Sequence, residues 1–108
     1  MAFAVVSAAA ATTPLPRRWL QQALCVHRHE SIDWYRTTDW LGRPSVDHGG
    51  MQIDIRTWAR FAPRRFPRSP EQATPHEQLV VAYKIWLANG RRFGGHQWYL
   101  SASRCGVA

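Results

Sequence analysis

Residues 74–90, T-P-H-E-Q-L-V-V-A-Y-K-I-W-L-A-N-G, are the stretch that decides the fold. Thr74 can cap a helix, the proline after it suits the first helical position, and Glu77 completes a capping box. Apolar residues then recur at helical spacing, and Asn89-Gly90 is a typical helix end. The stretch therefore predicts a helix. Its expected buried stripe consists of Leu79, Val80, Tyr83, Trp86 and Leu87.

A second helix is predicted from Pro16 to about His29, because apolar residues between Trp19 and Val26 also recur at helical spacing. Residues 37–50 are rich in turn-forming residues, and residues 51–55 alternate between apolar and polar side chains, which indicates a short strand in a hairpin or an extended loop. A short helix is expected at residues 55–61. Four prolines in residues 62–75 exclude a helix interior there.

The composition limits the function classes. A chain of 108 residues allows one domain, and 45% hydrophobic residues with six tryptophans can fill a core. Thirteen arginines and one lysine oppose seven acidic residues, so the net charge of +7 favours polyanions such as nucleic acid, anionic lipid or an acidic cell wall. The arginines are spread along the chain, however, and are equally compatible with a solvated surface. No run of 18 apolar residues predicts a transmembrane helix.

The N-terminus has the composition of an export signal. Residues 2–11, A-F-A-V-V-S-A-A-A-A, form an apolar run, and small residues follow. We interpret residues 1–16 as an export-signal remnant or a flexible tail, outside the folded domain of residues 17–108. The two cysteines, Cys25 and Cys105, would form a disulfide in an exported protein and would be two inert thiols in the cytosol.

Two short stretches are candidates for chemistry. Glu30 follows an apolar helix and precedes Trp34-Tyr35, so burial would raise the pKa of its carboxyl and keep it protonated as a general acid. The alternative is a surface glutamate at a helix end. In G-G-M-Q, residues 49–52, the paired glycines allow close backbone approach, and Gln52 can hydrogen-bond a sugar amide or hydroxyl. The alternative is a tight turn into a strand.

Other kinds of site find little support. Cys25 and His29 share a helix face at four-residue spacing, but two ligands do not make a zinc site, so we predict no metal and no cofactor. A Ser/His/Asp triad lacks any G-x-S-x-G pattern. No nucleic-acid-binding motif accompanies the arginines, so no specific nucleic-acid partner is expected.

Taken in order, several pieces of residues 19–106 resemble a known family. They are W-L-Q-Q-A-L-C (19–25), H-E-S (29–31), G-G-M-Q-I (49–53), T-W (57–58), E-Q-A-T-P-H-E-Q-L-V-V-A (71–82), Trp98 and Cys105-Gly106. The chain resembles the catalytic domain of the resuscitation-promoting factors and, more broadly, the lytic transglycosylases and goose-type lysozymes. It departs from the former in two places. Four residues separate Cys25 from Glu30, where those factors have none, and the stretch from Gly90 to Cys105 is longer and richer in arginine.

The resemblance implies a fold, a site and an activity. The fold would be α+β and mostly α, a small lysozyme-like domain with a turn-rich or short β segment and one disulfide, Cys25–Cys105. The resemblance makes Glu30 the catalytic acid, places substrate contact at Gly50 and Gln52, and lines a sugar subsite with Trp98.

The activity implied is cleavage of the bond between N-acetylmuramic acid and N-acetylglucosamine in peptidoglycan, by a secreted or wall-associated monomer whose partner is the glycan strand. We expect a lytic transglycosylase more than a hydrolase, because no second carboxylate carries a family motif; Asp33, Asp47 and Asp54 are the nearest candidates. The alternative is a non-catalytic wall-binding or signalling module on the same fold.

Overall fold

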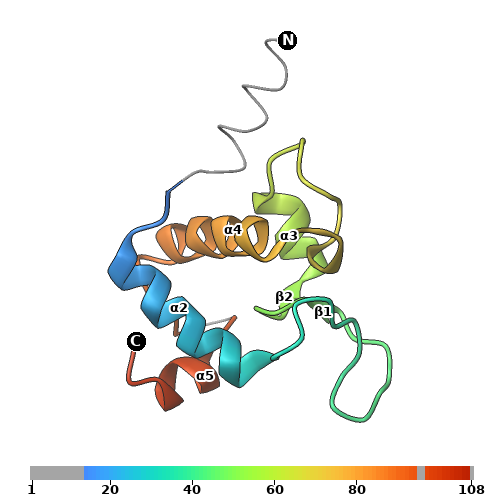
Figure 1. Cartoon of the computed structure of the whole chain (residues 1–108), viewed down its shortest axis with the longest axis horizontal. Coiled ribbons are helices and arrows are strands. Elements are labelled where there is room, and N and C mark those ends of the chain that lie inside the picture. Colours follow the sequence, from blue (N-terminus) through green and yellow to red (C-terminus); the bar gives the residue numbers. More distant parts are fainter. Residues whose placement is uncertain (1–13, 95–96, 108) are drawn as a thin grey trace.

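The computed structural model describes residues 14–94 and 97–107. Its elements are, in order, α2 (Arg17–Glu30), β1 (Asp47–His48), β2 (Ile53–Asp54), α3 (Ile55–Phe61), the 3-10 turn η1 (Pro70–Gln72), α4 (Pro75–Ala88) and α5 (Tyr99–Arg104). α4 crosses the middle of the molecule, α3 packs near one end of α4, and α5 lies beside α2 (Figure 1). The fold is small and mostly helical with one two-stranded sheet, which confirms the predicted fold class.

α2 places Glu30 at its last position. Trp19, Ala23 and Val26 are buried at steps of four and three residues, which puts them on one face of the helix. The helix ends because Ser31 is extended, with φ of −166°, while its N–H still bonds to the carbonyl of His27. The prediction of a helix from residue 16 to about residue 29 is therefore correct to within one residue.

α4 is the central helix, and its predicted capping box is confirmed. The Thr74 side chain accepts the N–H of Glu77, and the Glu77 carboxylate accepts the N–H of Thr74. Residues 78–82 are all buried, so the first turns of the helix are covered on several sides. The prediction was wrong for Leu87, which is 40% exposed, because the last turn of α4 emerges from the core and only one side of it stays covered.

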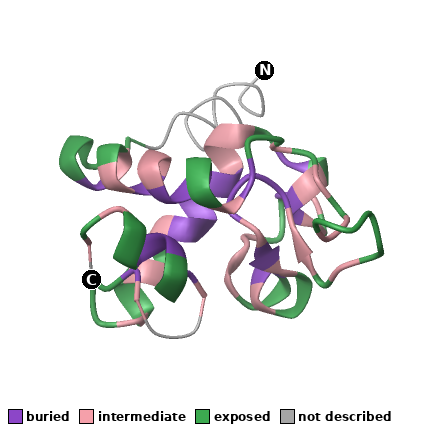
Figure 2. Ribbon diagram, turned by 90° about the horizontal axis from the view of Figure 1, so that it is seen from below, coloured by how far each residue is buried: buried purple, intermediate pink, exposed green. Residues whose placement is uncertain are grey.

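An aromatic cluster joins the two long helices to the C-terminal segment. Trp19 on α2 meets Tyr83 on α4 edge-on, with ring centroids 4.9 Å apart, and stacks on Phe93 at 6.0 Å. Phe93 in turn lies 5.9 Å from Trp98. Buried residues gather where the elements meet, and exposed residues cover the outer sides (Figure 2). Part of the tryptophan content therefore builds the core.

The β-hairpin is shorter than the alternation of residues 51–55 predicted. β1 and β2 pair antiparallel in the register Asp47↔Asp54 and His48↔Ile53. Residues 49–52 form the turn between them, with left-handed φ of +82° at Gly49 and +48° at Gln52. α3 follows at once over the predicted residues, and the Asp54 carboxylate caps it by accepting backbone N–H groups of the first turn.

The C-terminal segment holds a helix that its sequence pattern does not predict. α5 spans six residues, too few to be stable alone in water, so it depends on its packing against α2. The implied disulfide is present: Cys25 in α2 and Cys105 just after α5 are joined, with their Cα atoms 6.0 Å apart. It fixes the end of α5 to the middle of α2.

The predicted export segment lies outside the described residues except for residues 14–16, of which Leu15 packs against the core. Among the helices that the structure describes, none is both long and apolar enough to cross a membrane.

Candidate active site

Glu30 lies at the junction of α2 and α5. The Ser101 hydroxyl on α5 donates to its carboxylate, with Oγ and Oε2 2.5 Å apart. Burial raises the pKa of Glu30, the Ser101 hydrogen bond lowers it, and the nearby negative charge of Asp47 raises it, with a net upward direction. Glu30 is thus a half-buried carboxyl that retains its proton more readily than an exposed glutamate.

Ser101 is a residue of this site that the sequence does not reveal. It is 71 positions from Glu30 and only 4% exposed. No local motif marks it, because the contact exists only once α5 packs against α2 and the disulfide closes beside it.

The Gly49–Gln52 turn is held by a buried hydrogen-bond network. The Gly50 N–H donates to Gln78 Oε1 at 2.9 Å, and His27 Nδ1 donates to the Gly50 carbonyl at 2.7 Å. Gln78 also donates to the Trp34 carbonyl at 2.8 Å, and the Trp34 ring stacks on His27. A Cβ on Gly50 would lie 2.3 Å from a Trp34 ring carbon, so only glycine fits. Both backbone polar groups of Gly50 are therefore committed to the protein.

Gln52 is the half-buried last residue of this turn. Its side-chain N–H donates to the backbone carbonyl of Gly49 at 2.8 Å, and the backbone carbonyl of Gln52 accepts from Gln97 Nε2 at 2.9 Å. The first bond uses one of the two N–H groups of the side-chain amide and orients it, and within the described residues no hydrogen bond to its Oε1 is found, so Oε1 can accept one from a ligand.

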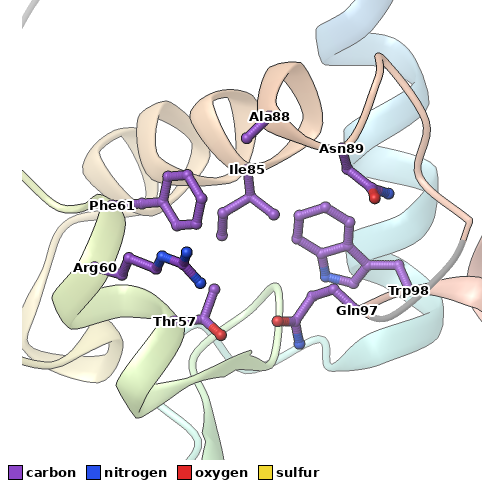
Figure 3. Close-up of a pocket in the computed structure, with 8 residues that line it drawn as sticks. All are labelled: Thr57, Arg60, Phe61, Ile85, Ala88, Asn89, Gln97 and Trp98. Carbon is purple, nitrogen blue, oxygen red and sulfur yellow. The ribbon is translucent and has the colours of Figure 1, made fainter.

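A cavity of about 420 Å³ opens between α3, α4 and the segment before α5 (Figure 3). Eight residues line it: Thr57, Arg60, Phe61, Ile85, Ala88, Asn89, Gln97 and Trp98. Trp98 is part of its wall but is only 1% exposed, and its indole N–H donates to the Met51 carbonyl at 2.7 Å. Trp98 therefore closes the cavity as a core residue, and the polar contacts come from side chains that the sequence analysis did not single out.

Glu30 does not line this cavity, but α5 connects the two. Ser101, which holds Glu30, follows Trp98 by three residues. The segment before α5 thus lines the cavity and α5 itself holds Glu30, and Gln97 of that segment donates to the backbone carbonyl of Gln52.

Among the three candidate second carboxylates, two have structural tasks. Asp33 accepts the Tyr35 N–H in a local turn, and Asp54 caps α3. Within residues 14–94 and 97–107, no hydrogen bond to the Asp47 carboxylate is found. Burial and the charge of Asp54 raise the pKa of Asp47. Asp47 is therefore the candidate whose charge acts on Glu30 and whose oxygens are free.

One group of potential metal ligands is more complete than the sequence spacing indicates. The ligand atoms of Cys25, His29 and Cys105 all lie within 4.8 Å of one another, because the fold adds Cys105 to the pair on α2. Both thiols are consumed by the disulfide, so this group does not offer thiolate ligands in the oxidised protein.

A comparison with protein families gives a match over residues 39–99 to the model described as transglycosylase-like domain. The chain belongs to this family. The matched residues of this transglycosylase-like domain include the hairpin, α3, α4 and Trp98, and Glu30 lies before them. Membership supports a glycosidase or transglycosylase role on peptidoglycan in general. No curated protein and no solved structure matched the chain.

Proposed function

We propose that this chain is a lytic transglycosylase that cleaves the bond between N-acetylmuramic acid and N-acetylglucosamine, with Glu30 as its single acid and base. The observation that carries the proposal is the half-buried Glu30 carboxyl, whose raised pKa suits a general acid and which is held by Ser101, three residues after the cavity-lining Trp98. The match to the transglycosylase-like family supports the substrate class.

The reaction begins with protonation of the glycosidic oxygen by Glu30. The bond from that oxygen to the muramic C1 breaks, its electron pair stays on the oxygen, and an oxocarbenium-like centre develops at C1. Glu30, now a carboxylate, takes the proton of the muramic 6-hydroxyl, and O6 bonds to C1. The products are a free N-acetylglucosamine 4-hydroxyl and a 1,6-anhydromuramic end, and Glu30 regains its proton.

Substrate contacts come from the turn and the cavity. Gln52 presents an amide oxygen, and the side chains of Asn89 and Gln97 present two more, which suits the N–H and hydroxyl donors of N-acetylated sugars. Gly50 contributes indirectly, because its buried bonds hold the turn that carries Gln52. Trp98 supports the wall of the sugar subsite from within the core.

The test is mass spectrometry of the products after the oxidised full chain is incubated with purified peptidoglycan. We expect anhydro-muropeptides from the wild type and none from Glu30→Gln. Glu77→Gln is the matched control, since glutamine also serves in a capping box, and it should stay active. Reducing-end products would refute the lyase outcome and point to hydrolysis assisted by Asp47. Glycan binding without cleavage by the wild type would favour a non-catalytic wall-binding module.

A further inference from the structure

Arg60 is the one charged side chain among the eight residues that line the cavity. It comes from α3, and its guanidinium points into the cavity from the wall opposite Gln97 and Trp98 (Figure 3). The ion pairs found in the described residues are Arg43–Asp39, His48–Glu71 and Arg56–Asp54, so no carboxylate there neutralises Arg60. Its guanidinium lies over the ring of Phe61, with Cζ 6.0 Å from the ring centroid.

Both side-chain amides of the cavity donate hydrogen bonds within the protein. Asn89 Nδ2 donates to the carbonyls of Arg92 and Gly94 at 3.0 and 2.7 Å, and Gln97 Nε2 donates to the Gln52 carbonyl. Within the described residues no hydrogen bond to either amide oxygen is found, so both oxygens are available as acceptors. Arg60 is the charged donor of this lining, and its planar group of five N–H donors matches a carboxylate.

The cavity thus has an acceptor side and a cationic side. N-acetyl and hydroxyl groups of a sugar are neutral and suit the acceptor side, whereas a lone guanidinium is best complemented by an anion. In peptidoglycan, the anionic groups nearest the glycan are carboxylates of the peptide stem. When the stem is removed, the lactyl group of muramic acid becomes a free carboxylate instead.

We propose that Arg60 binds a carboxylate of the peptide stem and makes this domain selective for glycan strands that still carry their stems. The inference rests on the proposed function, since it names the part of the same substrate that the cavity recognises. Arg60 is exposed, and it differs from the arginines that only contribute to the net charge because it lines the cavity.

The experiment compares three forms of the glycan: strands with intact stems, strands whose stem carboxyls have been amidated, and strands denuded by an amidase. For the wild-type full chain we expect the lowest KM on intact stems. Arg60→Gln should raise that KM about tenfold, as expected for the loss of a hydrogen-bonded charge pair at an accessible site, with little change in kcat. On amidated stems, Arg60→Gln should change KM less than twofold. On intact stems, the KM of Arg60→Lys should lie between those of the wild type and Arg60→Gln, because lysine keeps the charge and loses the planar geometry.

Arg64→Gln is the matched control, since it removes the same charge four residues further along and outside this cavity. Equal effects of Arg60→Gln and Arg64→Gln on all three glycans would overturn the proposal and leave only a general charge effect. An effect of Arg60→Gln confined to denuded strands would also overturn it, because it would assign the carboxylate to the lactyl group.

A binding measurement separates this inference from the proposed reaction. The Kd of a soluble disaccharide-tetrapeptide is measured by calorimetry on the Glu30→Gln protein, with and without Arg60→Gln. A tenfold weaker Kd supports the role of Arg60 even if no glycan is ever cleaved. An unchanged Kd overturns it even if cleavage by the wild type is established.

Discussion

Gln78 is the buried residue whose replacement tests the architecture of the site most directly. It is fully buried, and its side-chain amide bonds to the Gly50 N–H and to the carbonyls of Trp34 and Ala73. Gln78→Leu keeps the side-chain volume and the helix but removes all three hydrogen bonds. The buried Gly50 N–H and Ala73 carbonyl would then be left without these bonds in the interior, and the half-buried Trp34 carbonyl would lose its bond as well.

The expected loss follows from the two buried groups. A buried polar group left unpaired costs roughly 1–3 kcal/mol, so two of them lower the free energy of unfolding by about 3 kcal/mol. With an m value in urea of about 1.5 kcal/mol per molar, the unfolding midpoint falls by about 2 M. The Gly49–Gln52 turn would also loosen, so we expect glycan cleavage to fall together with stability.

The assay is urea unfolding of the oxidised protein followed by far-UV circular dichroism. Gln21→Leu is the matched control, because Gln21 is exposed on α2 and the same substitution there should change stability by no more than about 0.5 kcal/mol. If Gln78→Leu unfolds at the same urea concentration as Gln21→Leu, the hydrogen bonds of Gln78 do not hold the turn and the reasoning is wrong.

Three further predictions concern charge and the disulfide. The negative charge of Asp47 raises the pKa of Glu30, so Asp47→Asn should move the alkaline limb of the pH profile of kcat to lower pH. Asp33→Asn is the control, and an equal pH profile for the two variants would contradict this prediction. Burial lowers the pKa of His27 from its ordinary 6.5, so folded protein binds fewer protons and stability falls as the pH drops below that value. His27→Gln can still donate to Gly50, and its free energy of unfolding should depend less on pH over the same range. An equal pH dependence in the wild type and the variant would refute burial of His27 as the cause. Replacing both cysteines by serine opens a loop whose ends are 80 residues apart and should lower the free energy of unfolding by about 4.5 kcal/mol in the chain-entropy account. Urea unfolding measures this loss, and a loss below about 1 kcal/mol would contradict that account.

The elements that the sequence predicted are those with local signals. The capping box at Thr74 and the spacing of apolar residues from Trp19 to Val26 each depend on neighbours within a few positions, and the structure has both helices. α5 has no such signal, because six residues cannot form a stable helix without the surface of α2 beneath them. The strand at residues 51–55 was overestimated, because the left-handed backbone of Gln52 extends the turn into it.

The sequence by itself determined the fold class, the family and the identity of the candidate acid, since all three rest on residue types and their order. Tertiary structure decided the surroundings of that acid. Ser101 and Asp47 act on Glu30 from segments distant in the chain, and Arg60 shares a cavity with Gln97 only because α3 and the segment before α5 meet. The physical reason is that burial, charge and hydrogen bonding act over a few ångströms in space, and long-range contacts carry no local pattern by which a sequence could reveal them.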